Sequence, residues 1–229
     1  MVIMIQKSYL NITEQEILKW QKTFKGIGNL FRQYSQYRLM KRWEEEYNFS
    51  SSVEVPYDEA TDGIDGNIFS HSHEAHRTLN SLSKKSFDFV WNFGFLQRQP
   101  SLIWKMKKIS KKYIAAFVPN YSNPGTLIHK LYHLIYKKPC NHPERGDPRL
   151  MSMNGLRKLF ENVGFNVLEV GYVDIPPFPD TVVTIKEFFG SGGRNALKIP
   201  INVKKLLPFE HILFPKFIFA HHCYVFAEK

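Results

Sequence analysis

The chain has 229 residues and 43% hydrophobic content, enough to bury the core of one domain with an appendage or of two small domains. Its 31 basic and 21 acidic residues give a net charge of +10, but the lysines are scattered, which favours a solvated basic face over a nucleic-acid-binding surface. No apolar run is long enough to span a membrane, and the first residues lack the basic region of a signal peptide. The two cysteines, Cys140 and Cys223, form no disulfide framework and indicate a reducing cytoplasm.

Residues 13–47 are expected to be helical. Thr13 and Glu16 form a capping box, which marks a helix start. Apolar residues then recur three and four positions apart and define one face: Ile17, Trp20, Phe24, Ile27, Phe31 and Tyr34. Gly26 and Gly28 predict a break or two helices. Residues 1–49 are expected to form a helical N-terminal extension. We expect its apolar face to pack on the rest of the molecule, with a dimer contact as the alternative.

Downstream, short apolar runs alternate with helical patterns. Strands are predicted at 53–55, 87–94, 113–118, 166–175 and 219–227, and helices at 71–83, 101–112, 126–136 and 152–162. Gly164 suits the position just after the last of these helices. The alternation predicts an α/β fold with a mostly parallel sheet covered on both faces, and the final strand suits an antiparallel addition.

Residues 86–120 carry a family resemblance. The run Phe-Asp-Phe-Val-Trp-Asn-Phe-Gly, which ends at Gly94, is similar to the fourth strand of class I S-adenosylmethionine-dependent methyltransferases of the type 11-like group. Leu96 matches the leucine that follows that strand, and residues 150–170 resemble the family's later helix, Gly-Phe turn and strand. The resemblance covers residues 50–229. It implies a Rossmann-like methyltransferase domain with an antiparallel last strand, which transfers a methyl group from S-adenosylmethionine to an unidentified acceptor.

The cofactor-binding half departs from the family pattern. Glu54 matches the acid that ends the family's first strand, but Pro56 stands where the first glycine belongs, and Gly63 and Gly66 come late. Only residues 67–86 precede the next strand, which is room for a single crossover. The family's second and third strands are therefore predicted to be missing, together with the acid that binds the ribose. In the family's numbering the sheet order becomes 1-4-5-7-6, with an exposed edge at strand 1.

The resemblance also implies site residues. Six residues are expected to bind the cofactor: Glu54, Gly63, Gly66, Asn92, Phe93 and Gly94. Asn120 and His129 follow the fifth strand and are expected to contact the acceptor, and the irregular segment 176–217 is expected to cap the site. No catalytic residue is nominated, because methyl transfer mostly needs alignment in a dry pocket.

Other interpretations remain beside this one. The shortened cofactor half is also consistent with a non-catalytic methyltransferase-fold relic or binding module without cofactor affinity. Cofactor binding is therefore expected to be weak or lost, unless a homo-oligomeric partner covers the edge of strand 1. The histidines are far apart in sequence and no CxxC pair is present, so no metal site is predicted. The aromatic residues around the 87–94 strand are interpreted as core rather than adenine-stacking groups: Trp91, Phe93 and Trp104. Phe95, just past the strand end, is consistent with either role.

Overall fold

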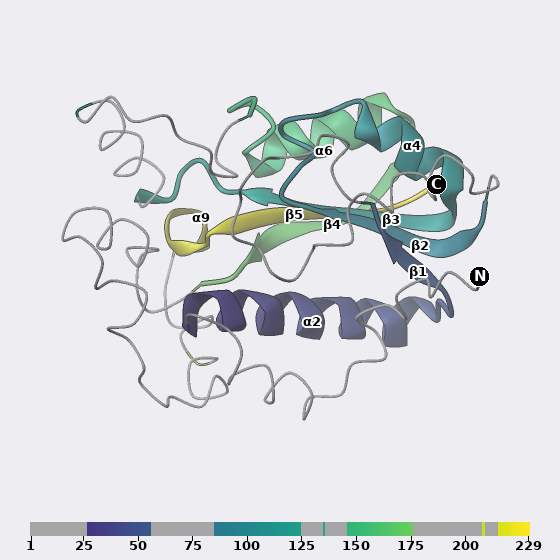
Figure 1. Cartoon of the computed structure of the whole chain (residues 1–229), viewed down its shortest axis with the longest axis horizontal. Helices are drawn as coiled ribbons and strands as arrows, with labels where there is room; N and C mark the ends of the chain where they lie inside the picture. The colour runs from purple at the N-terminus through teal and green to yellow at the C-terminus, as the bar shows by residue number, and fades with distance from the viewer. Residues whose placement is uncertain (1–26, 56–84, 125–134, 136–145, 176–207, 209–214) are drawn as a thin grey trace, which may run out of the picture.

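The computed structural model describes residues 27–55, 85–124, 135, 146–175, 208 and 215–229, with side chains from residue 34 onward (Figure 1). Five strands form one sheet in these ranges: β1 (Ser52–Glu54), β2 (Phe87–Phe93), β3 (Ser110–Pro119), β4 (Asn166–Val173) and β5 (His222–Glu228). The described helices are α2 (Ile27–Tyr47), α4 (Leu102–Ile109), α6 (Met153–Asn162) and α9 (Lys216–Phe219). None of these helices is long and apolar enough to cross a membrane.

The sheet has the order β1-β2-β3-β5-β4. Strands β1, β2 and β3 are parallel, whereas β5 runs antiparallel to both of its neighbours, β3 and β4. This is the order predicted from the sequence, with β2, β3, β5 and β4 in the places of the family's fourth, fifth, seventh and sixth strands. Residues 56–84 lie outside the described residues, so the predicted absence of two further strands stays a prediction.

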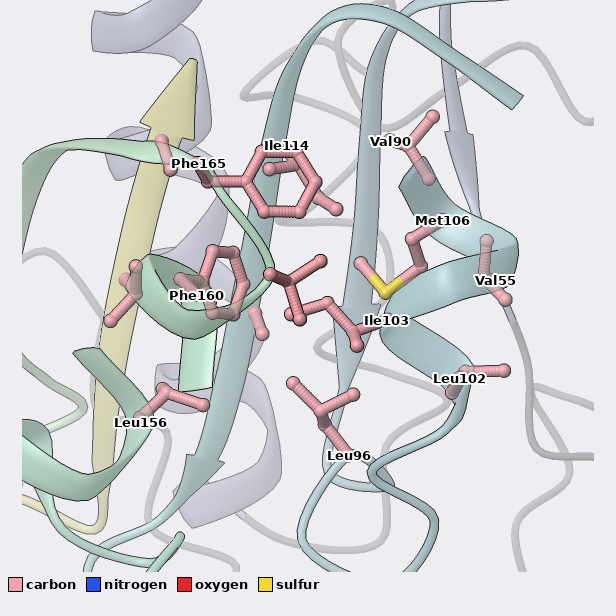
Figure 2. Packing of buried hydrophobic residues seen from close by; sticks show 14 of the residues in the cluster. Val55, Val90, Leu96, Leu102, Ile103, Met106, Ile114, Leu156, Phe160 and Phe165 are labelled. Atoms are coloured by element: carbon pink, nitrogen blue, oxygen red, sulfur yellow. The ribbon is translucent and has the colours of Figure 1, made fainter. Parts of the chain in front are cut away.

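Two helical layers cover the sheet (Figure 1). On one face, α4 and α6 direct apolar side chains onto β2, β3 and β5. Figure 2 shows Ile103 and Met106 from α4 and Phe160 from α6 meeting over the sheet, and all three are completely or almost completely buried. The opposite face is covered by α2. Burial on both faces explains why most of β2 and residues 113–119 of β3 are apolar without alternation.

Helix α6 begins and ends where its sequence predicts. The Ser152 hydroxyl accepts a hydrogen bond from the Gly155 amide at 3.1 Å and caps the start of the helix. Gly164 has φ of 84°, a left-handed conformation that a residue with a Cβ adopts at a cost, and it ends the helix. Leu156 and Phe160 lie one turn apart and are fully buried. The predicted helix, glycine stop and following strand are therefore confirmed.

Three expectations about local structure were wrong. Strand β3 begins at Ser110, three residues before the predicted start, because Ser110 pairs with Phe87 in register and continues the parallel ladder. Phe219 ends the short helix α9, and the last strand begins only at His222. Trp104 is not a core residue: its side chain lies on the outer side of α4 and is 59% exposed.

Helix α2 is anchored to the sheet by its last turns. The Trp43 ring is completely buried and stacks on Phe226 with centroids 4.5 Å apart and an interplanar angle of 14°. The Trp43 indole N–H donates to Glu169 on β4 at 2.8 Å, and Arg42 and the Tyr224 hydroxyl donate to the same carboxylate. Ile17 and Phe24 of the expected apolar face lie outside the described residues, and the boundary at residue 49 stays a prediction.

Candidate functional site

One edge of the sheet collects the carboxyl ends of the three parallel strands. Open α/β sheets place ligands at such an edge. Here β1 ends at Glu54, β2 at Phe93 and β3 at Pro119. Because β5 is antiparallel, it starts at this edge: His222 pairs with Pro119 on one side and with Val173, the last residue of β4, on the other. One end of each of the five strands therefore lies along the same edge.

The expected cofactor residues divide between the two faces of this edge. Glu54 pairs in register with Trp91, and Trp91 belongs to the core beneath α2, so the Glu54 side chain lies on the α2 side. Phe93, two residues after Trp91, also contacts that core. Val55 belongs to the opposite core, beneath α4 and α6, and Asn92 binds its carbonyl oxygen.

Glu54 has an unusual protonation equilibrium. Burial of this half-buried residue raises the pKa of its carboxyl to about 8, and no cation or hydrogen-bond donor among the described residues offsets this effect. The side chain therefore carries a proton for most of the time at neutral pH. A cationic ligand placed beside it would stabilise the carboxylate and release that proton.

The Asn92 side chain forms hydrogen bonds with the protein's own backbone. Its Nδ2 donates to the Val55 carbonyl oxygen at 2.7 Å, and its Oδ1 accepts from the Leu96 amide at 3.1 Å. The residue is fully buried. These bonds tie the end of β1 to the turn after β2, which gives Asn92 a positioning role; a direct ligand contact remains only a prediction.

Gly94 turns the chain at the end of β2. Its φ of +73° lies in the left-handed region, and its amide donates to the Phe117 carbonyl oxygen at 2.8 Å. A Cβ built at this position would meet no atom within 4 Å. The glycine is therefore favoured by the backbone conformation, in a turn where the residue itself is buried.

The turn after β3 is fastened to the segment before β5. The Asn120 Nδ2 donates to the carbonyl oxygens of Phe217 and Ala220, at 2.7 and 2.8 Å. The Asn123 Nδ2 donates to the carbonyl oxygens of Phe219 and Ala220, both at 3.1 Å. Asn120 thus lies at the predicted edge, held in a structural network. The other predicted residues, Gly63, Gly66 and His129, lie outside the described part of the chain.

A buried acid–histidine cluster at this edge was missed by the sequence reasoning. The Asp174 Oδ2 lies 3.3 Å from the Nδ1 of His222 and 3.4 Å from the Nδ1 of His221. Burial raises the pKa of Asp174, but the two imidazoles outweigh it and hold that pKa well below its usual range. Asp174 directly follows β4, His221 directly precedes β5, and His222 is the first residue of β5. Only the antiparallel pairing of these strands brings the cluster together.

The His222 ring also contacts Phe93. The two ring centroids are 4.9 Å apart with an interplanar angle of 48°. This contact joins the acid–histidine cluster to the end of β2, where the sequence placed the transfer site. Within the described ranges no group of three or more metal-ligating side chains is arranged to hold an ion. Burial raises the pKa of the neighbouring Cys223 thiol to about 12, so it is no nucleophile at neutral pH.

The described residues thus form an α/β protein with a mixed five-stranded sheet. The carboxyl ends of β1, β2 and β3 lie at the edge where open α/β sheets bind ligands. The sequence matches no protein-family model and no curated protein. The structure is similar to the crystal structure of a SAM dependent methyltransferase from Archaeoglobus fulgidus, over 93% of this chain and 99% of that one. The TM-score is 0.42 and the sequence identity is 16%, a similarity that does not assign the chain to a family.

Proposed function

We propose that the chain binds S-adenosylmethionine at the carboxyl edge of the sheet and transfers its methyl group to an acceptor. The observation that carries this proposal is the strand order β1-β2-β3-β5-β4 with an antiparallel β5. It is the order that the resemblance of residues 86–120 and 150–170 to class I methyltransferases implies. The sequence resemblance and the strand order thus support the same class of function.

Two features of the described edge fit this cofactor. The Glu54 carboxyl has no described partner, and the cationic methionine end of the cofactor supplies one. Gly94 has no side chain, and a Cβ at its position would contact no described atom within 4 Å, so the residue does not itself obstruct a ligand. When bound, the cofactor supplies an electrophilic methyl group on a positively charged sulfur. Glu54, with Gly63 and Gly66, would lie beside the methionine part, and Phe93 and Gly94 would border the methyl group.

Calorimetric titration with S-adenosylmethionine and S-adenosylhomocysteine tests the proposal. We expect weak binding, because loss of the ribose-binding acid costs about 1.5–3 kcal/mol, which is roughly ten- to hundredfold in affinity. Binding should release a proton from Glu54 at pH 7, so the measured heat should change between two buffers of different ionisation enthalpy. The matched variant Glu54→Gln should bind without this buffer dependence.

The oligomeric state has to be measured in the same samples. A second copy that covers the outer edge of β1 would restore part of the missing cofactor wall, since an uncovered edge strand is a site for strand addition. Affinity should then rise with protein concentration in parallel with dimer formation. Absence of binding at millimolar cofactor, in monomer and oligomer alike, would contradict the proposed function.

A non-catalytic binding module is the second candidate. One observation favours it: the hydrogen bonds described for the amides of Asn92 and Asn120 all end on the protein's own backbone. Such bonds preserve the edge of the fold without contributing to a cofactor. The same titration separates the two candidates, because a module of this kind would keep its stability and show no heat of binding.

A further inference from the structure

We propose that the end of the sheet opposite the candidate site docks a single-stranded nucleic acid. The surface, which we call the lysine end, is formed by one exposed tryptophan and four lysines: Trp104, Lys85, Lys107, Lys108 and Lys229. It lies where β2 and β3 begin and β5 ends, and Figure 1 shows the C-terminal end of the chain beside α4 there. The inference is therefore independent of the proposed methyl transfer.

The fold brings together four lysines that are spread along the sequence from residue 85 to residue 229. The Lys85 amide donates to the Lys108 carbonyl oxygen at 3.0 Å, which places the segment before β2 against the last turn of α4. Lys229 directly follows β5, and its Nζ donates to the Lys107 carbonyl oxygen at 2.7 Å. The scatter of the lysines in the sequence favoured a solvated basic face, but these four are neighbours in the structure.

The positive charges of the lysine end act on one another. Partial desolvation lowers the pKa of Lys229, and the charges of Lys85 and Lys107 lower it further. These ammonium groups are thus close enough to repel each other. In the described part of the chain, none of the four lysines forms an ion pair with an acidic side chain. A phosphate bound between them would relieve this repulsion.

The acidic side chains near the lysine end are already paired with other lysines. Asp88 lies 3.2 Å from Lys111, and Glu228 lies 3.6 Å from Lys112. The glutamates at positions 44–46 belong to α2, which covers the opposite face of the sheet from α4. The surface between α4 and the end of β5 therefore keeps a positive charge that suits an anionic partner.

Helix capping accounts for only part of the cluster. The Lys107 Nζ donates to the Val163 carbonyl oxygen at the end of α6, at 2.5 Å, and Lys229 donates to carbonyl oxygens at the end of α4. Cations at a helix C-terminus are stabilised by the helix dipole. The ammonium groups of Lys85 and Lys108 make no such bond to the described residues, and both residues are exposed. These two lysines are therefore the best placed to bind a ligand.

Trp104 makes a nucleic acid the partner that fits this surface. Its side chain is 59% exposed, and the Lys107 Nζ lies 5.8 Å from its ring centroid. Proteins that bind single strands without sequence preference stack bases on exposed aromatic rings, while nearby cations bind the flanking phosphates. A duplex keeps its bases stacked on each other, so an exposed ring with lysines beside it suits a single strand.

A membrane surface fits the lysine end less well. Docking to a lipid interface needs several apolar side chains on one side of the protein. Trp104 is the one large exposed aromatic residue that the described ranges place at the lysine end. The exposed rings of Tyr121, Phe217 and Phe219 lie after β3 or before β5, at the opposite edge of the sheet.

Fluorescence anisotropy with a labelled oligouridylate of about 12 nucleotides tests the proposal on the full chain without cofactor. Four phosphate contacts predict a slope of about −2.8 for the logarithm of the binding constant against the logarithm of the salt concentration. Affinity should then fall about fiftyfold between about 50 and 200 mM salt. In the double variant Lys85→Gln/Lys108→Gln the slope should be about −1.4, and the same change in salt should cost only about sevenfold.

The matched control is Lys41→Gln/Lys216→Gln, which removes the same charge from α2 and α9, away from the lysine end. Its slope should equal that of the wild type. Trp104→Ala should weaken binding by about five- to hundredfold without changing the slope, whereas Trp104→Phe should keep most of the affinity. Circular dichroism and thermal melting establish that each variant is folded.

Equal losses in the lysine-end variant and the control would overturn the proposal, because binding would then follow net charge alone. Absence of binding at about 50 mM salt would overturn it as well. Tighter binding to vesicles of phosphatidylserine and phosphatidylcholine, lost in Trp104→Ala, would assign the surface to a membrane instead. Oligodeoxythymidylate of the same length distinguishes DNA from RNA, and binding of either strand supports the proposal. None of these outcomes depends on S-adenosylmethionine, so failure of the proposed function would leave this inference standing.

Discussion

Replacement of Glu169 by glutamine should undock helix α2 from the sheet. The Glu169 carboxylate accepts hydrogen bonds from Arg42 at 2.5 and 2.6 Å, from the Trp43 indole at 2.8 Å and from the Tyr224 hydroxyl at 2.5 Å. Burial raises its pKa, but these donors outweigh that effect and lower the pKa overall. The carboxylate is thus ionised at neutral pH and serves three donors from two elements.

The expected loss in the free energy of unfolding depends on which of these donors are buried. Trp43 is fully buried and Tyr224 is 7% exposed, so each loses a bond to a charged group, worth about 1.5–3 kcal/mol. The Arg42 side chain is 52% exposed, and its ion pair contributes well under 1 kcal/mol. The glutamine oxygen recovers part of the loss, while its NH₂ group faces a donor. We expect Glu169→Gln to lower the free energy of unfolding by about 2–4 kcal/mol.

Urea denaturation at pH 7, followed by intrinsic tryptophan fluorescence and by circular dichroism, measures this loss. Glu161→Gln is the matched control: Glu161 pairs with Arg157 one turn away on the exposed side of α6, and its loss should cost about 0.3–0.5 kcal/mol. Equal effects of the two substitutions would refute the reasoning. It would mean that α2 is held by its apolar contacts alone.

Two further predictions concern single positions. The Glu54 carboxyl has a pKa of about 8 in the folded chain and an ordinary value near 4.5 when unfolded, so its contribution to stability is complete below 4.5 and is lost as the pH rises to 8. The melting temperature should therefore decrease less between pH 5 and pH 8.5 in Glu54→Gln than in the wild type. An equal decrease in both proteins would show that Glu54 is solvated. Gly171→Ala places a Cβ 2.6 Å from the Tyr224 hydroxyl oxygen and should cost about 1–3 kcal/mol by displacing that ring. In urea denaturation its effect should be less than additive with Glu169→Gln, because both break the Tyr224–Glu169 bond; full additivity would contradict this.

The sheet could be predicted because its strongest sequence signals are local. The apolar run that ends at Gly94 forms β2 over Phe87–Phe93, and the Ser152 cap and Gly164 stop bound α6. The start of β3 was missed because Lys111 and Lys112 continue a helical pattern of polar residues. In the structure, Lys111 instead reaches the Asp88 carboxylate across the strand pair at 3.2 Å, a contact that no local pattern contains.

The candidate site could be predicted less well, because its members depend on pairing between distant strands. The sequence placed Glu54, Phe93 and Asn120 at one edge, but gave no indication that Asn92 and Glu54 face opposite sides of it. Asp174 and His222 are 48 residues apart in sequence and meet only because β4 and β5 are antiparallel neighbours. The sequence alone does not show which acidic residues and histidines will be neighbours until the strand register is known.

The short edge strand β1 raises the question of how Glu54 keeps its position. Two side chains from β2 answer it for the described residues. At the start of β1, the Asp88 Oδ2 accepts hydrogen bonds from the amides and hydroxyls of Ser50 and Ser51, at 2.8 to 3.2 Å. At its end, Asn92 binds the carbonyl oxygen of Val55.

Asp88 is suited to this task by its ionisation. Burial raises the pKa of Asp88, but the donors from Ser51, Ser50 and Lys111 lower it to about 2, so the carboxylate is charged at any physiological pH. A strand of three residues is thus fixed at both ends by its neighbour, without support from a further strand in the described part of the sheet. The register that places Glu54 beside Trp91 is therefore set by β2 itself. The short strand β1 can in this way present Glu54 at the edge where we propose that the cofactor binds.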